Sequence, residues 1–144
     1  MSSEPYHCVV DASVGIKLFI EEEFSDIAQG LFSKLADESA TELYIPDLFF
    51  IECANILLKY TRRFKRPLED SQADLADLHK LALNVVPTGE LMEDALTLAH
   101  EKNLTAYDAC YAILAQRLEL PLVTADEPLA KSVEWAIWVG DLQL

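Results

Sequence analysis

The sequence predicts an α/β fold, a three-layer α/β/α sandwich around a central, mostly parallel sheet of four to five strands. Three observations lead to this prediction. Short apolar runs, typical of buried parallel strands, recur along the chain. Segments whose apolar residues follow helical spacing lie between these runs. Strands that alternate with helices predict a parallel sheet that helices cover on both faces.

The first third of the chain begins with an apolar run, HCVVD at 7–11, which predicts a strand. A short helix is expected at 12–20, because turn residues precede it and its length suits a helix. Residues 25–39 carry a clearer apolar stripe at helical spacing, and Ser25 is the expected N-cap.

The rest of the chain repeats the alternation. ELYIP at 42–46 predicts a second strand, and Asp47 is expected to cap a helix that extends through a basic segment to Pro67. Further strands are expected at 83–87, 121–125 and 135–139, and further helices at about 69–82, from 88 onward, at about 105–118 and at about 127–133.

Length and composition predict one domain, spanning residues 1–144, with a sizeable core. The hydrophobic content of 51% argues against disorder. No apolar run reaches the roughly 18–20 residues that cross a membrane. The N-terminal stretch has no basic segment before an apolar run, as a signal peptide would have. We therefore expect a cytoplasmic protein.

Cys8, Cys53 and Cys110 form no C-x-x-C pair, so we expect small buried hydrophobes rather than disulfides or a zinc site.

Four acids lie in separate segments that are expected to meet at one edge of the sheet. Asp11 and Asp126 follow predicted strands. Asp108 lies in the first turn of a predicted helix, and Glu52 about one and a half turns into another. Ligands of open parallel sheets bind beyond the carboxyl ends of the strands. Helix capping is the alternative, because Asp11 and Asp126 suit N-caps and Thr105-x-x-Asp108 resembles a capping box. Both explanations remain open.

Glu52 is harder to explain as a structural residue, because it lies too deep in its helix to cap it. Its surroundings, FFIECANILL, are otherwise almost wholly apolar, with no Lys or Arg four residues away. An unpaired buried carboxylate is costly or shifts its pKa strongly. A divalent cation would satisfy Glu52 and offset the repulsion among the aspartates. Carboxylate ligands without Cys or His suit Mg²⁺ or Mn²⁺.

Three motifs in this order, VVDAS, FFIECAN and TAYDACYAILAQRLELPLVTADEPLA, resemble those of PIN-domain ribonucleases, especially the VapC-type toxins of toxin–antitoxin pairs. The resemblance runs from about Val9 to Val139 and depends on the ordered set D…E…D-A…L-x-T-x-D. It implies a PIN-like fold and metal-dependent hydrolysis of RNA phosphodiester bonds, with one or two Mg²⁺ or Mn²⁺ ions as cofactor.

The resemblance also implies roles for individual residues. Ser13 and Thr124 match hydroxyl residues of the family and are expected to orient a carboxylate or a metal-bound water. Asn55, one turn after Glu52, is a further candidate support. No histidine is required as a base, and His7, His79 and His100 stand apart from the acid motifs. The implied catalytic and metal-binding acids are Asp11, Glu52, Asp108 and Asp126.

The formal net charge of −14 is awkward for a protein that binds RNA. Local contacts are therefore expected from a basic cluster, with Lys17 as a second candidate. A solvated helix end, whose cations complement the helix dipole, is the alternative. The resemblance further implies a homodimer and a cognate antitoxin protein as partners, with no membrane. The basic cluster consists of Lys59, Arg62, Arg63, Lys65 and Arg66.

Other functions fit the sequence less well. A haloacid-dehalogenase phosphotransferase needs D-x-D, and residue 13 is Ser. A dinucleotide site needs G-x-G-x-x-G, which is absent. A non-catalytic PIN-like module that binds a protein partner is the main alternative, although it gives no reason for Glu52 in an apolar helix. A purely structural cation site is a third, weaker idea.

Overall fold

A computed structural model describes residues 4–36 and 40–144. Its centre is a five-stranded sheet in the order β3-β2-β1-β4-β5, and every neighbouring pair is parallel. This confirms the predicted fold class. The strands are β1 His7–Val10, β2 Glu42–Pro46, β3 Asn84–Val86, β4 Leu122–Thr124 and β5 Ala136–Trp138.

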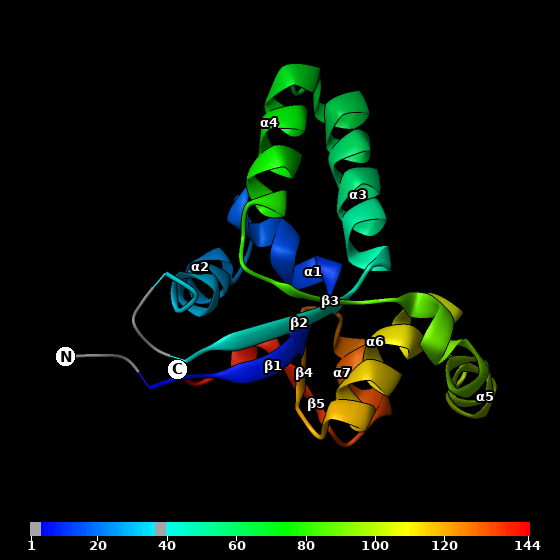
Figure 1. Cartoon of the computed structure of the whole chain (residues 1–144). Helices are drawn as coiled ribbons and strands as arrows, with labels where there is room; N and C mark the ends of the chain where they lie inside the picture. Colours follow the sequence, from blue (N-terminus) through cyan, green and yellow to red (C-terminus); the bar gives the residue numbers. More distant parts are fainter. Residues whose placement is uncertain (1–3, 37–39) are drawn as a thin grey trace.

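Helices cover both faces of the sheet, with α1 and α3 on one side and α6 and α7 on the other, while α4 packs on α3 and α5 on α6 (Figure 1). The three predicted layers are therefore present. The helices are α1 Ala12–Gly15, α2 Ser25–Ser33, α3 Leu48–Phe64, α4 Leu68–His79, α5 Met92–Lys102, α6 Ala106–Leu118 and α7 Glu127–Ser132. Short 3₁₀ segments are η1 Ile16–Leu18, η2 Thr88–Leu91 and η3 Val139–Asp141.

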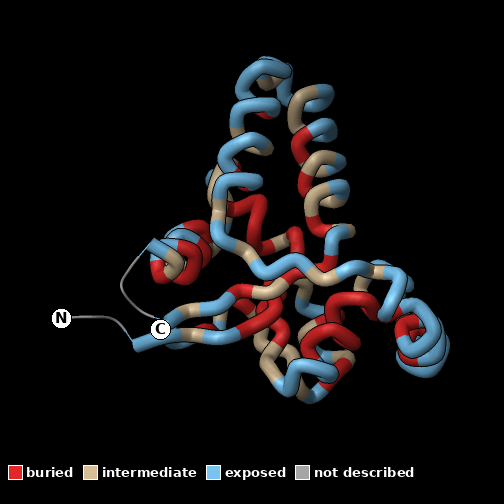
Figure 2. Tube along the Cα trace, in the orientation of Figure 1, coloured by how far each residue is buried: buried red, intermediate tan, exposed pale blue. Residues whose placement is uncertain are grey.

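The core lies around strands β1 and β4 and helix α6, where the trace is almost continuously buried (Figure 2). Every residue of β4 is buried, whereas the edge strand β3 is largely exposed. In α6 all residues from Ala109 to Ala115 are buried, and the alanines among them let the helix approach the sheet closely. The three cysteines are free and buried, as predicted.

One predicted helix cap is wrong, and a second holds its N-cap position without the expected side-chain bond. Phe24, with φ of 67°, holds the N-cap position of α2, while the Ser25 hydroxyl accepts the Glu22 N–H and donates to the Ile20 carbonyl. Ser25 therefore stabilises the preceding turn. Asp47 makes no side-chain cap bond to α3. Its carboxylate instead accepts the N–H and hydroxyl of Thr88, which joins the start of α3 to η2.

Helix lengths differ from the predictions at three places. The segment 12–20 divides into α1 and η1, and the helix predicted at 25–39 ends at Ser33. Residues 37–39 of that prediction lie outside the described residues. Helix α3 ends at Phe64 rather than Pro67, because Lys65 adopts a left-handed conformation with φ of 53°.

The order of the strands places a topological switch point at the centre of the sheet. From β1 the chain first builds β2 and β3 on one side, and then β4 and β5 on the other. Ligands of such sheets bind beyond the carboxyl ends of the strands at this switch. Asp11 follows β1 and Asp126 follows β4, so both flank the switch point. Among the described helices, none combines the length and apolarity that a membrane crossing requires.

Candidate functional site

The four predicted acids line one hollow of about 140 Å³ at the carboxyl ends of β1 and β4. They come from four different segments, as the sequence predicts. Asp11 follows β1, Glu52 lies in α3, Asp108 in the first turn of α6, and Asp126 at the start of α7. The complete lining is Asp11, Ala12, Ser13, Glu52, Ile56, Asp108, Tyr111 and Asp126.

Asp11 is the most deeply buried of the acids, with 5% of its surface exposed. Its Oδ1 caps α1 by accepting the Ser13 N–H at 3.0 Å, and it also accepts the Ser13 hydroxyl. Its Oδ2 accepts the Thr124 hydroxyl at 2.6 Å. Three donors therefore hold the carboxylate in one orientation, and the two hydroxyls that the sequence singles out are among them.

The same two hydroxyls connect the loop after β1 to the loop after β4. Ser13 Oγ accepts the Ala125 N–H at 2.9 Å, and Thr124 Oγ1 accepts the Asp126 N–H at 3.0 Å. Each hydroxyl thus donates to Asp11 and accepts from the β4–α7 loop. The two loops, more than a hundred residues apart in the sequence, are held in register at the site.

Glu52 has a partner that the sequence analysis missed. The Tyr111 hydroxyl donates to Glu52 Oε1 at 2.6 Å, and Tyr111 itself is 1% exposed. Tyr111 lies three residues after Asp108 on α6, so both side chains share one helix face. That spacing is the signal in the sequence from which Tyr111 could have been predicted as a residue of the site. The bond satisfies one oxygen of Glu52 and leaves the other available.

Asp126 both caps a helix and lines the hollow. Its Oδ1 accepts the Leu129 N–H at 3.1 Å at the start of α7. At Asp108 the first half of the predicted capping box is present, because Thr105 is the N-cap of α6 and its hydroxyl accepts the Asp108 N–H at 3.0 Å. The Asp108 carboxylate also lines the hollow.

The four carboxylates repel one another across the hollow. Burial raises the pKa of Asp11 to about 6, against the hydrogen bonds from Ser13 and Thr124, and the charges of Asp108 and Glu52 add to the rise. Burial also raises the pKa of Glu52 and of Asp108, each with a contribution from a neighbouring acid. No Lys, Arg or His lines the hollow in the described part of the chain. A cation from outside would therefore relieve the repulsion.

The donor set fits a hard divalent cation, because it consists of carboxylate oxygens with hydroxyls behind them. As the side chains stand, no three His, Cys, Asp or Glu within residues 4–36 and 40–144 are close enough to share an ion. The acids surround the hollow from separate elements, and the remaining carboxylate oxygens of Glu52, Asp108 and Asp126 are the ones that would turn toward a metal.

Two further predicted residues lie elsewhere or have other roles. Asn55 is exposed, and no hydrogen bond joins it to Glu52 among the described residues. Lys17 is 7% exposed and does not offer a free cation to RNA. Its ammonium group pairs with Glu22 at 3.2 Å and donates to the Glu23 carbonyl at 2.7 Å. Burial and these contacts give Lys17 a structural role and argue against the RNA contact predicted for it.

The basic cluster divides into two parts. Arg66 is paired with Asp74 and donates to Ser71 at 2.8 Å, so it joins α3 to α4 and is not free for RNA. The remaining members are exposed and form no ion pair with a described carboxylate. These free members are Lys59, Arg62, Arg63 and Lys65.

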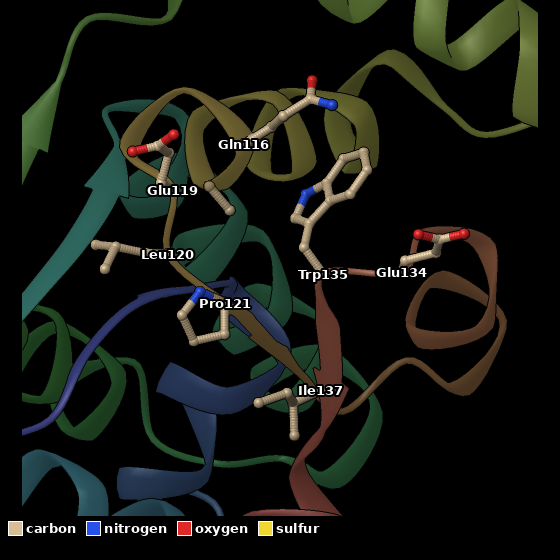
Figure 3. Close-up of a pocket in the computed structure, with 8 residues that line it drawn as sticks. Gln116, Glu119, Leu120, Pro121, Glu134, Trp135 and Ile137 are labelled. Carbon is tan, nitrogen blue, oxygen red and sulfur yellow. The ribbon is translucent and has the colours of Figure 1, made fainter.

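A larger hollow of about 460 Å³ lies away from the acids, at the amino ends of β4 and β5 (Figure 3). Leu120 and Pro121 precede β4, Trp135 precedes β5, and Ile137 lies in β5. The indole N–H of Trp135 donates to the Ala112 carbonyl at 2.8 Å. None of the four acids reaches this hollow, so it is separate from the candidate site.

Comparison with known proteins agrees with the fold and the acid motifs. The family model described as the PIN domain matches residues 8–133. The chain is 36% identical over 125 residues to Ribonuclease VapC3 of Pyrobaculum aerophilum, an alignment that covers 85% of this chain and 92% of that protein.

Solved structures share the fold. The crystal structure of PAE2754 from Pyrobaculum aerophilum has a TM-score of 0.68 and 28% identity, with 96% of this chain and 93% of that chain covered. A toxin–antitoxin complex from Klebsiella pneumoniae contains a chain with a TM-score of 0.64 and 16% identity, with 90% and 95% covered. From the extent of the family match and the identity to a VapC ribonuclease, we conclude that this chain belongs to the PIN-domain family and is similar to its VapC-type members.

Proposed function

We propose that this protein is an endoribonuclease that hydrolyses RNA phosphodiester bonds with Mg²⁺ or Mn²⁺ as cofactor. The observation that carries the proposal is the set of four carboxylates around one hollow that contains no basic side chain. A purely structural site has little use for Glu52 in this place, because it lies too deep in α3 to cap the helix and burial raises its pKa. The identity to a ribonuclease across most of the chain supports the same activity.

Asp11, Glu52, Asp108 and Asp126 would hold the metal, and Ser13, Thr124 and Tyr111 would orient three of these ligands. A bound divalent ion would supply an acidified water and stabilise the charge that develops on the phosphate. The chain itself contributes rigid positioning. Hydroxyl donors hold Asp11 in place, and Tyr111 fixes one oxygen of Glu52, so binding of an ion would reorient mainly the remaining carboxylate oxygens of Glu52, Asp108 and Asp126.

We further propose that the protein is the toxin of a type II toxin–antitoxin pair, active as a homodimer and inhibited by a cognate antitoxin protein. The support is the similarity to Ribonuclease VapC3 and the shared fold with a chain of a toxin–antitoxin complex. Analytical ultracentrifugation tests the dimer. Expression of the chain in cells, with and without the protein encoded next to its gene, tests the inhibition through growth arrest and its relief.

The test of the activity is cleavage of a mixed tRNA and rRNA pool in Mg²⁺, in Mn²⁺ and in chelator. Wild-type protein is expected to cut only with metal, and Asp108→Asn is expected to lose most of the cutting. Glu134→Gln removes one charge at an exposed acid beside the other hollow and should cut like the wild type. If Asp108→Asn kept full activity, Asp108 would have no role at the metal. No cutting by folded, metal-loaded protein would favour a non-catalytic module that binds a protein partner.

A further inference from the structure

The free cations of this acidic protein are concentrated at one place. The chain has 11 Lys and Arg against 25 Asp and Glu, yet Lys59, Arg62, Arg63 and Lys65 form no ion pair in the described structure. Other cations, such as Arg66 and Arg117, are paired with carboxylates. An acidic protein that leaves four neighbouring cations unpaired offers a local binding surface for an anion.

Helix α3 connects this cluster to the acid site along one face. At 3.6 residues per turn, Ile56, Lys59 and Arg63 lie within about 40° of the direction in which Glu52 points. Glu52 and Ile56 line the acid hollow, while Lys59 and Arg63 line a second hollow of about 330 Å³ further along the helix. Arg62 also lines the second hollow but points about 80° away from Glu52.

The helix fixes the distances along this face. At a rise of 1.5 Å per residue, the backbones of Lys59 and Arg63 lie about 10 Å and about 16 Å beyond that of Glu52. A stacked single strand has a phosphate about every 3.4 Å, so the two cations would meet phosphates about three and about five nucleotides from one held at the acids. Helices α3 and α4 rise together from the sheet, so this face extends outward from the site (Figure 1).

We propose that the Lys59–Arg63 face of α3 is a phosphate-binding track that positions single-stranded RNA, with the strand on one side of the cut following the helix. The proposal builds on the ribonuclease function above and adds the direction of the strand and the length of substrate that the protein senses. We expect Arg62, Lys65 and the overall charge to contribute less to RNA binding than Lys59 and Arg63. If the basic cluster were only a solvated helix end, RNA binding would not depend on Lys59 and Arg63.

Binding of single-stranded RNA of random sequence tests the proposal, with fluorescence anisotropy as the readout. The Asp108→Asn background prevents the probe from being cut during the measurement. The probes range from about two nucleotides, too short to reach either cation, to lengths that extend past both. Lys59→Gln with Arg63→Gln should remove most of the affinity gained from length. At about 0.7 released counterions per phosphate, this loss is about 25-fold in 0.1 M salt, and the salt slope should fall by about 1.4.

Three controls define the outcome. Lys102→Gln removes one exposed, unpaired charge at the end of α5 and should leave binding unchanged. Lys59→Arg with Arg63→Lys keeps both charges and should retain the affinity. Arg62→Gln should weaken binding less than Arg63→Gln. Unchanged binding in the double Gln variant, or equal losses for Arg62→Gln and Arg63→Gln, would overturn the track.

The proposed function and the track fail in different ways. If wild-type protein binds RNA through Lys59 and Arg63 but cuts none with any metal, the track stands and the nuclease proposal fails. If wild-type protein cuts RNA and the double Gln variant cuts it with the same KM, the nuclease stands and the track is overturned. If the double Gln variant bound RNA like the wild type but bound an acidic protein partner more weakly, the track would likewise be overturned.

Discussion

The Thr124 hydroxyl joins two of the four acids, because it donates to Asp11 Oδ2 at 2.6 Å and accepts the Asp126 N–H at 3.0 Å. Thr124 is completely buried, so no water replaces either bond. The last residue of β4 therefore sets both the orientation of Asp11 and the backbone that carries Asp126. This arrangement makes the hydroxyl, and not only the size, of residue 124 important.

Thr124→Val is expected to destabilise the protein by about 1–3 kcal/mol, because it keeps the shape but leaves a buried acceptor and a buried N–H without partners. Affinity for Mn²⁺ should fall about 10- to 100-fold, as it does when groups that orient metal ligands are lost. Urea unfolding and titration calorimetry measure the two effects. Thr124→Ser keeps the hydroxyl and serves as the control. Wild-type Mn²⁺ affinity in the Val variant would contradict the orienting role.

The fold was predictable because its signals are local. Apolar runs that fill central strands and apolar stripes on α3 and α5 are visible in a single segment, and together they predicted the parallel sheet. The acids Asp11 and Asp126 were predictable for the same reason, since Asp11 directly follows β1 and Asp126 lies two residues after the end of β4. Parallel strands then bring their carboxyl ends together without further information.

The errors share a different cause, because each depends on a partner far along the chain. Asp47 turns away from its own helix because Thr88, 41 residues later, offers two donors. The partner of Glu52 is Tyr111, 59 residues away. Lys17 looked like a free cation until the fold of the next loop buried it against Glu22. Spacing within a segment predicts faces and caps, but it does not identify which faces meet.

Tyr111→Phe tests the partner of Glu52. The change removes only the hydroxyl, so packing in the core should persist and stability should fall by about 1 kcal/mol. The freed Glu52 carboxylate should lose its orientation, and Mn²⁺ affinity and RNA cleavage should both decrease by about tenfold. Tyr107→Phe is the matched control, because Tyr107 lies on the same helix and is 62% exposed. Equal cleavage by both variants would show that the Tyr111 hydroxyl does not support the site.

Gly15→Ala tests the close contact between α1 and α3 that places Asp11 opposite Glu52. A Cβ at Gly15 would lie 2.6 Å from Cζ of Phe49 and 2.9 Å from its Cε2. The backbone at Gly15 is helical, with φ of −59°, so alanine would otherwise be favoured. Overpacking against the buried ring should outweigh that gain and destabilise the protein by about 1–3 kcal/mol.

The control for this prediction is Gly89→Ala, because nothing lies within 4 Å of a Cβ added there. That change should be neutral or stabilise the protein by up to about 1 kcal/mol, since alanine reduces the freedom of the unfolded chain. Urea midpoints compare the two variants. If Gly15→Ala proved as stable as Gly89→Ala, Phe49 would have to move without cost, and the contact would not constrain the site.

The metal-free protein should become less stable as the pH rises from about 4 to about 6, because unfolding lets the buried Asp11 carboxyl group lose its proton in this range. Its carboxyl has a pKa of about 6 in the folded protein and 3.8 as an unperturbed group. Between these values the folded state keeps the proton and the unfolded state releases it, so rising pH favours unfolding. Above pH 6 the loss is complete, and two pKa units correspond to about 3 kcal/mol.

Asp11→Asn removes this titration, so its stability should change less than that of the wild type across the same pH range. At pH 7 in chelator the variant should be the more stable of the two, although it binds metal poorly. Urea unfolding at intervals from pH 4 to pH 7 measures the difference, and Mn²⁺ should reverse the order by stabilising only the wild type. If the two proteins kept the same stability difference at every pH, the ionised Asp11 would not strain the fold. The site acids would then coexist without a cation, and the central argument for a metal at this position would fall.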